Sequence, residues 1–427
     1  MKKLFVRLLG FGAMLIASAM SVASAELPQY AEADHMGVAS CASGVCHGSV
    51  RGKDVTSVLQ NEYVVWSRMD RHRIAYQTLL TPESKSIAAK LGIGNAHEAK
   101  ICLDCHADNV AIEKRSEKFQ IEDGVGCEAC HGGAQQYISS HVDVDSNHKA
   151  NVSAGLYPTD QPRERAELCL SCHLGTGEKM ATHDIMGAGH PRVSFELDTF
   201  GALQPPHYVV DDDYKAEKWH GSNIDVWAIG QVTAAKQTLA LIDDRLNQGG
   251  LFPEIALFDC HACHHSMSEK RWTASERSGL PPGSVRLNDA NFVIVLALAE
   301  VMGEGSDVAL RNEVKKLHLA VNKNGDYSSS IAALTTTLNQ IDSKLSSVDL
   351  SSSAQPLIEA MIRNTIAGNL TDYVVAEQAI MAIDMLLEYR GVREEYSLWL
   401  DQVYSTLQDE DNFSADDYID SMRLFGA

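Results

Sequence analysis

Residues 124–133 read GVGCEACHGG, and the Cys-x-x-Cys-His pattern inside this stretch recurs along the chain. Three more copies are CLDCH at 102–106, CLSCH at 169–173 and CHACH at 260–264. A wider version, CASGVCH at 41–47, has four residues between its cysteines. Chance would give roughly 0.01 Cys-x-x-Cys-His motifs in a chain of this composition. The ten cysteines thus form five pairs, each followed directly by a histidine.

This pattern predicts covalent attachment of five haem c groups. Two thiols add across the two vinyl groups of one haem, and the adjacent histidine becomes the proximal iron ligand. The expected attachment residues are Cys41, Cys46, Cys102, Cys105, Cys127, Cys130, Cys169, Cys172, Cys260 and Cys263. The expected proximal ligands are His47, His106, His131, His173 and His264. The wider first motif is assigned by analogy with the other four.

Two other uses of the cysteines compete with haem. Cys102, Cys105, Cys127 and Cys130 have the spacing of a four-thiolate zinc ribbon. Disulfide or redox pairs are also possible in an oxidising compartment. Neither alternative requires a histidine after every second cysteine, so haem attachment is the preferred interpretation.

Twelve further histidines could supply the sixth iron ligands. A second histidine closes the iron and suits electron transfer, whereas an empty sixth position permits chemistry on small molecules. The local sequence favours His72 in WSRMDRHRIAY, His141 behind the third motif, His183 and His190 in HDIMGAGHP, and His207 after two prolines. These five are the predicted distal ligands.

The remaining candidates rank lower. Met180 and Met186 are alternative axial ligands, because Met also binds haem iron. His35 and His318 are expected to be bland residues, since one lies in the mature N-terminal tail and the other in an amphipathic helix remote from any cysteine. His261 and His265 flank the fifth motif and could serve only a different haem.

The N-terminus predicts export. Residues 1–25 contain a basic start, an apolar run and a closing Ala-Ser-Ala, which is typical of a cleavable signal peptide. We therefore expect a periplasmic or extracellular protein with no membrane span in the mature chain. The formal net charge of −21 argues against nucleic acid as a partner and favours redox partners with a basic docking surface. The oligomeric state is left open.

The predicted fold is mainly α, in two parts after the signal peptide. Residues 26–284 hold all the motifs and are expected to form a haem domain of short helices and loops around stacked haems, crossed by one long helix at 224–246. The break RSGLPPGS then leads into a C-terminal helical bundle, residues 285–427. Its expected helices are 289–303, 306–322, 328–346, 353–368, 371–390 and 393–408, with Thr371 as the N-cap of the fifth.

The order of features from residue 41 to 173 resembles the tetrahaem cytochrome c that accepts electrons from hydroxylamine oxidoreductase. That family combines a first motif, a Trp followed by a His-containing helix, a second motif, GVGCESCHGPG with a trailing His, and a fourth motif. The resemblance implies that His72 and His141 are distal ligands borrowed by other haems, and that the haems stack in close pairs. The wide first spacing, the fifth motif and the C-terminal helices depart from the family.

Three functions are compatible with these observations, one of them a subunit of an extracellular or membrane-associated electron conduit that would dock through the C-terminal bundle. The first is a periplasmic pentahaem cytochrome that relays electrons between redox partners through mostly bis-His haems. The alternative is a multihaem oxidoreductase that converts a small nitrogen or sulfur compound at one open haem. The sequence gives no catalytic residue for the second, so whether the protein is an enzyme stays undecided.

Overall fold

The computed structural model describes residues 25–53, 58–247, 253–264, 277–281, 283–303, 305–323, 325 and 327–426. Within these ranges the chain is helical, and its only β-structure is two isolated bridges, His35 with Arg115 and Phe258 with Leu287. The predicted mainly α fold is confirmed. The predicted signal peptide lies outside the described residues except for Ala25, and His265 lies outside them as well.

The described residues 25–222, here called the haem-motif region, contain the first four motifs. Their helices are short: α1 (Glu62–Met69), α2 (Ala75–Thr78), α3 (Pro82–Leu91), α4 (Lys100–His106), α5 (Cys127–His131), α6 (His148–Ser153), α7 (Pro162–His173), α8 (His183–Gly187), α9 (Leu197–Leu203) and α10 (Asp212–Glu217). Single turns of 3-10 helix connect them: η1 (Val38–Ser40), η2 (Arg71–Ile74), η3 (Ala96–Glu98), η4 (Ile112–Lys114), η5 (Ile121–Asp123), η6 (Ala134–Gln136) and η7 (Ser140–Val142).

The helical bundle follows, with longer elements. It comprises α11 (Asn223–Asn247), α12 (Ala290–Met302), α13 (Ser306–Asn322), α14 (Tyr327–Leu345), α15 (Ala354–Ile366), α16 (Tyr373–Tyr389), α17 (Ser397–Ser405) and α18 (Ala415–Arg423). Four 3-10 turns accompany it: η8 (Ile255–Leu257), η9 (Cys260–Ala262), η10 (Leu350–Ser353) and η11 (Arg393–Tyr396). The predicted bundle helices are all present, although the sixth begins as 3-10 helix, and α18 was not predicted.

Local signals explain the clearest boundaries. The Thr81 hydroxyl accepts a hydrogen bond from the Ser84 amide, Pro82 occupies the first turn, and Gly92 ends α3 in the left-handed conformation.

The prediction that Thr371 caps α16 is wrong. Asp372 is the N-cap residue, and its carboxylate binds two arginines instead of the helix amides.

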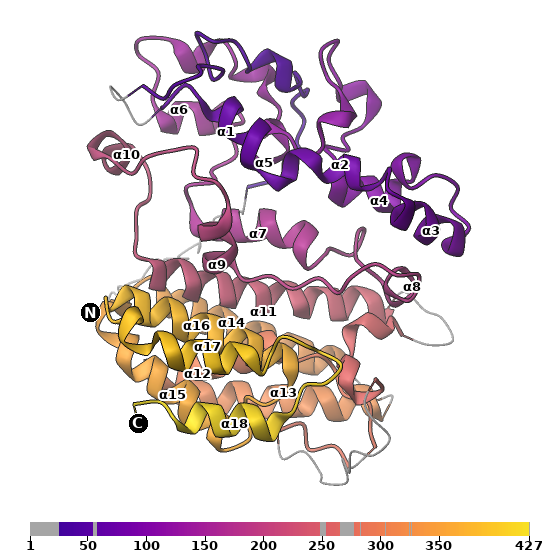
Figure 1. Ribbon diagram of the computed structural model, residues 1–427, viewed down its shortest axis with the longest axis vertical. Coiled ribbons are helices and arrows are strands. Elements are labelled where there is room, and N and C mark those ends of the chain that lie inside the picture. Colours follow the sequence, from indigo (N-terminus) through magenta and orange to yellow (C-terminus); the bar gives the residue numbers. More distant parts are fainter. Residues whose placement is uncertain are drawn as a thin grey trace, which may run out of the picture.

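The long helix α11 lies between the two parts of the molecule (Figure 1). It packs against α7 and α9 of the haem-motif region and against α12, α14 and α16 of the bundle. Trp227, Val232 and Ile242 of α11 are buried in the same apolar core as α12 and α16. The predicted division at residue 284 stays a prediction, but α11 and Leu257, which precede it, contribute to the bundle core.

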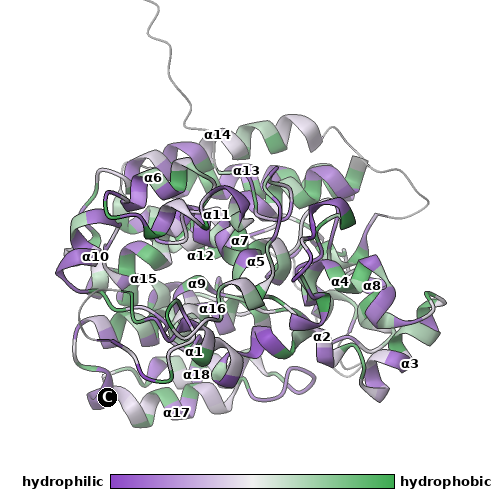
Figure 2. Cartoon of the chain, turned by 90° about the horizontal axis from the view of Figure 1, so that it is seen from above, coloured by the Kyte–Doolittle hydropathy of each residue, from purple (hydrophilic) through white to green (hydrophobic). Residues whose placement is uncertain are grey.

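The haem-motif region has less apolar packing of its own. Its described side chains contribute to two small buried clusters, one around Tyr76 and Leu103 and one in which Leu170 and Leu197 pack with α11. Hydrophilic and hydrophobic residues alternate along its short elements, as α3, α4 and α8 show at one edge (Figure 2). None of the described helices is long and apolar enough to cross a membrane.

Candidate haem-binding sites

Short helices place the motif residues. The second, third and fourth motifs occupy α4, α5 and the end of α7, so that each of these helices ends on its motif histidine. The fifth motif begins in η9 and ends at His264. In the wider first motif a turn replaces the helix, and the His47 amide donates to the Cys41 carbonyl over 3.2 Å. All five motifs therefore bring their histidine back beside their cysteines.

All ten cysteines are described, and none forms a disulfide. The side chain of Cys41 instead interacts with that of Cys127, and the side chain of Cys105 with that of Cys172. These contacts pair the first motif with the third and the second with the fourth. A search of the described residues finds no cluster of three or more His, Cys, Asp or Glu side chains that could hold a metal ion.

Each of the five motif histidines faces one of the five predicted distal histidines. The ring centroids lie 6.3 Å apart for His47 and His141, 6.2 Å for His106 and His190, 6.1 Å for His131 and His207, 6.1 Å for His173 and His72, and 6.3 Å for His264 and His183. Two metal–nitrogen bonds of about 2 Å, plus about 1.1 Å from each nitrogen to its ring centre, span about 6 Å. The five pairs therefore have the separation that two axial imidazoles on one iron require.

The paired histidines differ from most of the others in which ring nitrogen binds a protein partner. Five of the ten paired rings have an identified hydrogen-bond partner, and it binds Nδ1 in each: Glu62 for His47, Asp70 for His72, the Ala75 carbonyl for His106, the Tyr137 carbonyl for His141 and the Pro191 carbonyl for His190. Nε2 is thereby left toward the opposite ring, as in metal sites where the second nitrogen is fixed by a hydrogen bond. His148, His261 and His318 use Nε2 for a protein partner and belong to no pair.

Burial adjusts the charge of these rings. It lowers the pKa of His131 to about 4, helped by His207, and it also lowers the pKa of His106 and His173. Neutral imidazole is the form that binds a metal. The hydrogen bond to Glu62 raises the pKa of His47, and the bond to Asp70 raises that of His72. Burial alone would raise the pKa of Asp70, but hydrogen bonds from His72 and Gln204 lower it to about 2.

One segment, residues 182–192, carries two of the opposing histidines. Thr182 caps α8 through the Ile185 amide, and the His183 amide donates to Glu254 over 2.9 Å. Lys90 of α3 donates to the Ala188 carbonyl over 2.8 Å, which holds the end of the segment that leads to His190. The segment therefore links the second motif, opposite His190, with the fifth, opposite His183.

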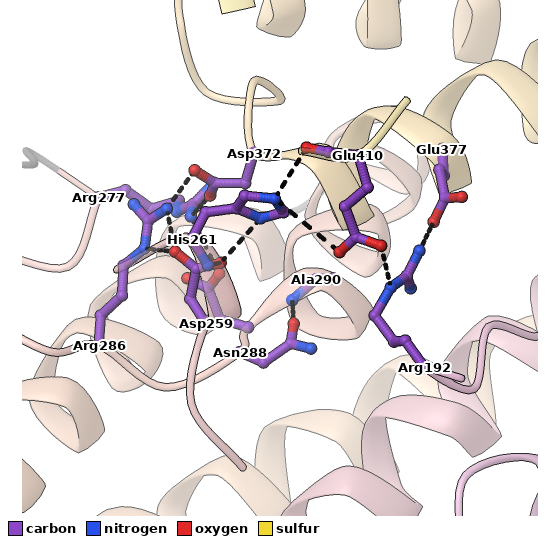
Figure 3. A network of polar contacts seen from close by, with 11 residues as sticks. Arg192, Asp259, His261, Arg277, Arg286, Asn288, Ala290, Asp372, Glu377 and Glu410 are labelled. Carbon is purple, nitrogen blue, oxygen red and sulfur yellow. Dashed lines mark hydrogen bonds and ion pairs between the residues drawn. The ribbon is translucent and has the colours of Figure 1, made fainter. Parts of the chain in front are cut away.

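A polar network fixes the fifth motif to the bundle (Figure 3). Asp259, directly before Cys260, binds Arg286 over 2.8 Å, and both Arg286 and Arg277 bind Asp372 at the start of α16. Arg277 also binds Asp289 over 3.0 Å. These ion pairs connect the motif to two bundle helices.

The same network reaches back to residue 192 (Figure 3). His261 donates toward the backbone carbonyl of Glu410 over 3.3 Å, and the carboxylate of Glu410 binds Arg192 over 3.1 Å. Arg192 also binds Glu377 of α16 over 2.7 Å. His261 therefore has a protein partner next to the bundle.

The other histidines and the two methionines have different surroundings. His35 was expected to be a bland residue of the N-terminal tail, yet it is fully buried and its Nδ1 lies 2.8 Å from Asp108. His318 is buried in the bundle 3.1 Å from Asp289, in keeping with a structural role. Met180 packs against the bundle core and Met186 lies in α8. Each motif histidine already faces a histidine, so no described ring pair needs these methionines.

The sequence did not reveal three features of the sites. Glu62 lies 15 positions from His47, and no periodic pattern joins them. Phe195 stacks on His173 with ring centroids 4.8 Å apart, although it lies 22 positions further along the chain. Asp70 is the exception among the three, because a carboxylate two residues before a predicted ligand is a local signal for a hydrogen bond to that ligand.

Comparison with known proteins gives one match. The family described as cytochrome c554 and c-prime matches residues 40–132, which contain the first three motifs. No curated protein and no solved structure matches the chain. The family match supports a multihaem c-type cytochrome with covalently bound haem and a role in electron transfer.

Proposed function

We propose that the protein is a periplasmic pentahaem c-type cytochrome that relays electrons between redox partner proteins. The single observation that supports this most strongly is the set of five opposed histidine pairs at 6.1–6.3 Å. Haem iron supplies the one-electron chemistry when bound. Two histidines on every iron would exclude small substrates and keep the ligand set unchanged during electron transfer.

The proposed assignment follows the motifs in chain order. Haem 1 takes Cys41, Cys46, His47 and His141; haem 2 takes Cys102, Cys105, His106 and His190; haem 3 takes Cys127, Cys130, His131 and His207; haem 4 takes Cys169, Cys172, His173 and His72; haem 5 takes Cys260, Cys263, His264 and His183. Every iron has two protein ligands in this assignment.

The contacts between motifs suggest a path through the protein. The cysteine contacts pair haem 1 with haem 3 and haem 2 with haem 4. Cys130 of the third motif lies near Cys169 and Cys172, whose charges raise its pKa further after burial has done so. The segment with His183 and His190 joins haem 2 to haem 5. We infer the order 1, 3, 4, 2, 5.

We propose that the bundle positions haem 5 at one end of this path. The ion pairs of Asp259 with Arg286, and of Asp372 with both arginines, support this role because they hold the fifth motif against α12 and α16. The acidic net charge favours a basic docking surface on one partner. Raising the ionic strength should then slow electron transfer to a basic redox protein.

The test is the electron paramagnetic resonance spectrum of the oxidised, mature protein, with haem quantified by pyridine haemochrome assay and mass. We expect five haems, all low-spin, in the periplasmic fraction of the expressing cells. A stoichiometric high-spin haem that shifts with nitrite, hydroxylamine or cyanide would overturn the relay proposal and favour the oxidoreductase.

A matched pair of variants tests the distal assignment. His190→Ala should leave five haems attached but convert one centre to high-spin. His220→Ala changes an exposed histidine outside the five pairs, so the spectrum should stay that of the parent protein. An unchanged spectrum in His190→Ala would remove this residue from the ligand set.

A further inference from the structure

The five histidine pairs differ in what holds their Nδ1 atoms. A carboxylate oxygen lies 2.9 Å from Nδ1 in two rings, Glu62 Oε2 at His47 and Asp70 Oδ1 at His72. The other Nδ1 partners at these sites are neutral: backbone carbonyls at His106, His141 and His190, with the Thr78 hydroxyl also at His106. The Nδ1 atoms of His47 and His72 therefore face a full negative charge, whereas the other three face only a dipole.

Both carboxylates are held in place by further bonds. The second oxygen of Glu62 accepts the Gln60 amide over 3.0 Å, and its side chain is 18% exposed. Asp70 also accepts the His72 amide over 2.9 Å and the Gln204 side chain over 3.1 Å, and its side chain is 7% exposed. Neither carboxylate can turn to solvent without losing several of these contacts.

A carboxylate that is hydrogen-bonded to Nδ1 makes the imidazole a stronger electron donor to a metal bound at Nε2. The N–H proton is drawn toward the carboxylate, the ring gains imidazolate character, and the ligand becomes more basic. Such a ligand, and the nearby negative charge itself, favour Fe(III) over Fe(II). Because both carboxylates are shielded from water, solvent screens their charge only in part.

We propose that Glu62 and Asp70 are tuning residues that lower the reduction potentials of haem 1 and haem 4, respectively. This inference rests on the proposed ligand assignment. In the inferred order 1, 3, 4, 2, 5, each close pair then holds one haem with such a carboxylate. Each carboxylate therefore shifts the potential difference within its own pair.

One buried charge acts in the opposite direction. Lys179 is buried, and its Nζ lies 3.2 Å from Cys172 of the fourth motif and 3.1 Å from the Asp104 carbonyl. A cation there favours Fe(II) at haem 4. The test therefore compares each variant with the parent protein and does not depend on the absolute ranking of haem 4.

The decisive variants are Glu62→Gln and Asp70→Asn in the mature holoprotein. Each keeps an oxygen that can accept the neighbouring backbone amide, so the fold is retained while the charge is removed. In a spectroelectrochemical titration we expect one centre to move to higher potential. At a fixed potential its ratio of reduced to oxidised haem should rise about tenfold, which is about 59 mV for one electron.

The control is Glu98→Gln. Glu98 is an exposed carboxylate of the same region that lies 3.7 Å from His97, a histidine outside the five pairs, and all five potentials should stay unchanged. Asp70→Glu, which restores the charge, should recover part of the low potential. A purely structural role of Asp70 would not produce this recovery.

The outcomes separate this inference from the function on which it rests. If the parent protein lacks five low-spin haems, the ligand assignment fails. If the parent protein has them, yet Glu62→Gln and Asp70→Asn titrate like the parent, the tuning role is wrong and the assignment stands.

Discussion

The haem-motif region and the helical bundle are built in different ways. The bundle buries one large apolar core, in which Ile294, Leu357 and Ile383 are completely inaccessible to solvent. The described part of the haem-motif region has two small apolar clusters, one of them shared with α11, and consists of short helices and turns joined by long-range polar contacts. A backbone held mainly by local turns and polar contacts needs its cofactors to complete the packing, whereas the bundle can rely on its own side chains.

The largest expected effect comes from removing one haem. The double change Cys127→Ala and Cys130→Ala should lower the haem mass by one unit and release hydrogen-exchange protection throughout α1, α5 and η6. Protection in α12 and α16 should persist, because their core contains no motif residue. Hydrogen exchange with mass spectrometry measures both regions in one sample. An unchanged haem mass would contradict haem attachment at this motif.

The second-largest effect is a loss of stability on removing the buried charge of Arg277. Arg277→Met leaves Asp289 and Asp372 with less compensation, and breaking a buried ion pair costs about 3–5 kcal/mol. Urea denaturation followed by circular dichroism measures the loss. Arg423→Met, which removes an exposed pair with Asp420, should change stability by no more than about 0.5 kcal/mol. Equal effects of the two variants would show that the network contributes little.

Truncation in the bundle core should be separable from haem chemistry. Leu386 is fully buried in α16, and Leu386→Ala should cost about 2–5 kcal/mol of stability. The haem spectrum and potentials should stay those of the parent protein. Leu398→Ala, at a position 85% exposed, is the matched control. A spectrum altered by Leu386→Ala would mean that the two regions are coupled more tightly than their packing indicates.

The smallest effect concerns acid stability. Burial alone would raise the pKa of Asp289, but Arg277 and His318 hold it below its usual value. A carboxyl with a lowered folded-state pKa contributes stability that is complete above the unfolded pKa of about 3.9 and is lost as the pH falls below it. One such group adds a slope of up to about 1.4 kcal/mol per pH unit in this window. Denaturation between pH 2 and 5 should show a shallower slope in Asp289→Asn, and an identical slope would contradict this.

Sequence periodicity predicted the bundle well because its helices carry continuous apolar faces. The expected helix at 306–322 has the observed bounds of α13, and the one at 224–246 differs from α11 by a single residue at each end. The helix α18 was missed because its sequence, ADDYIDSMR, offers only Tyr418 and Met422 as buried apolar anchors. Polar segments of this kind become helical through tertiary contact, here with α15 and α17.

The sequence predicted which histidines would be candidate ligands but not which rings would face each other. Motif spacing predicts the cysteines and the proximal histidines, which stay predictions, and the glycines and prolines nearby indicate the distal candidates. Which ring faces which depends on the path of the chain: His72 meets His173 across 101 positions. The partners of the Nδ1 atoms are likewise long-range at His47 and His106, so no local pattern could reveal them.

The angles between the paired rings divide four of the proposed haems into two spectroscopic classes. The planes of His47 and His141 are nearly parallel, at 10°, whereas those of His72 and His173, His106 and His190, and His131 and His207 are nearly perpendicular, at 87–90°. Parallel imidazoles act on the same iron d orbital and separate it from its partner, while perpendicular ones act on both equally. Haem 1 should therefore give a rhombic low-spin signal, distinct from the highly anisotropic signals of haems 2, 3 and 4. Ring orientation alone thus distinguishes the signal of haem 1 from those of haems 2, 3 and 4.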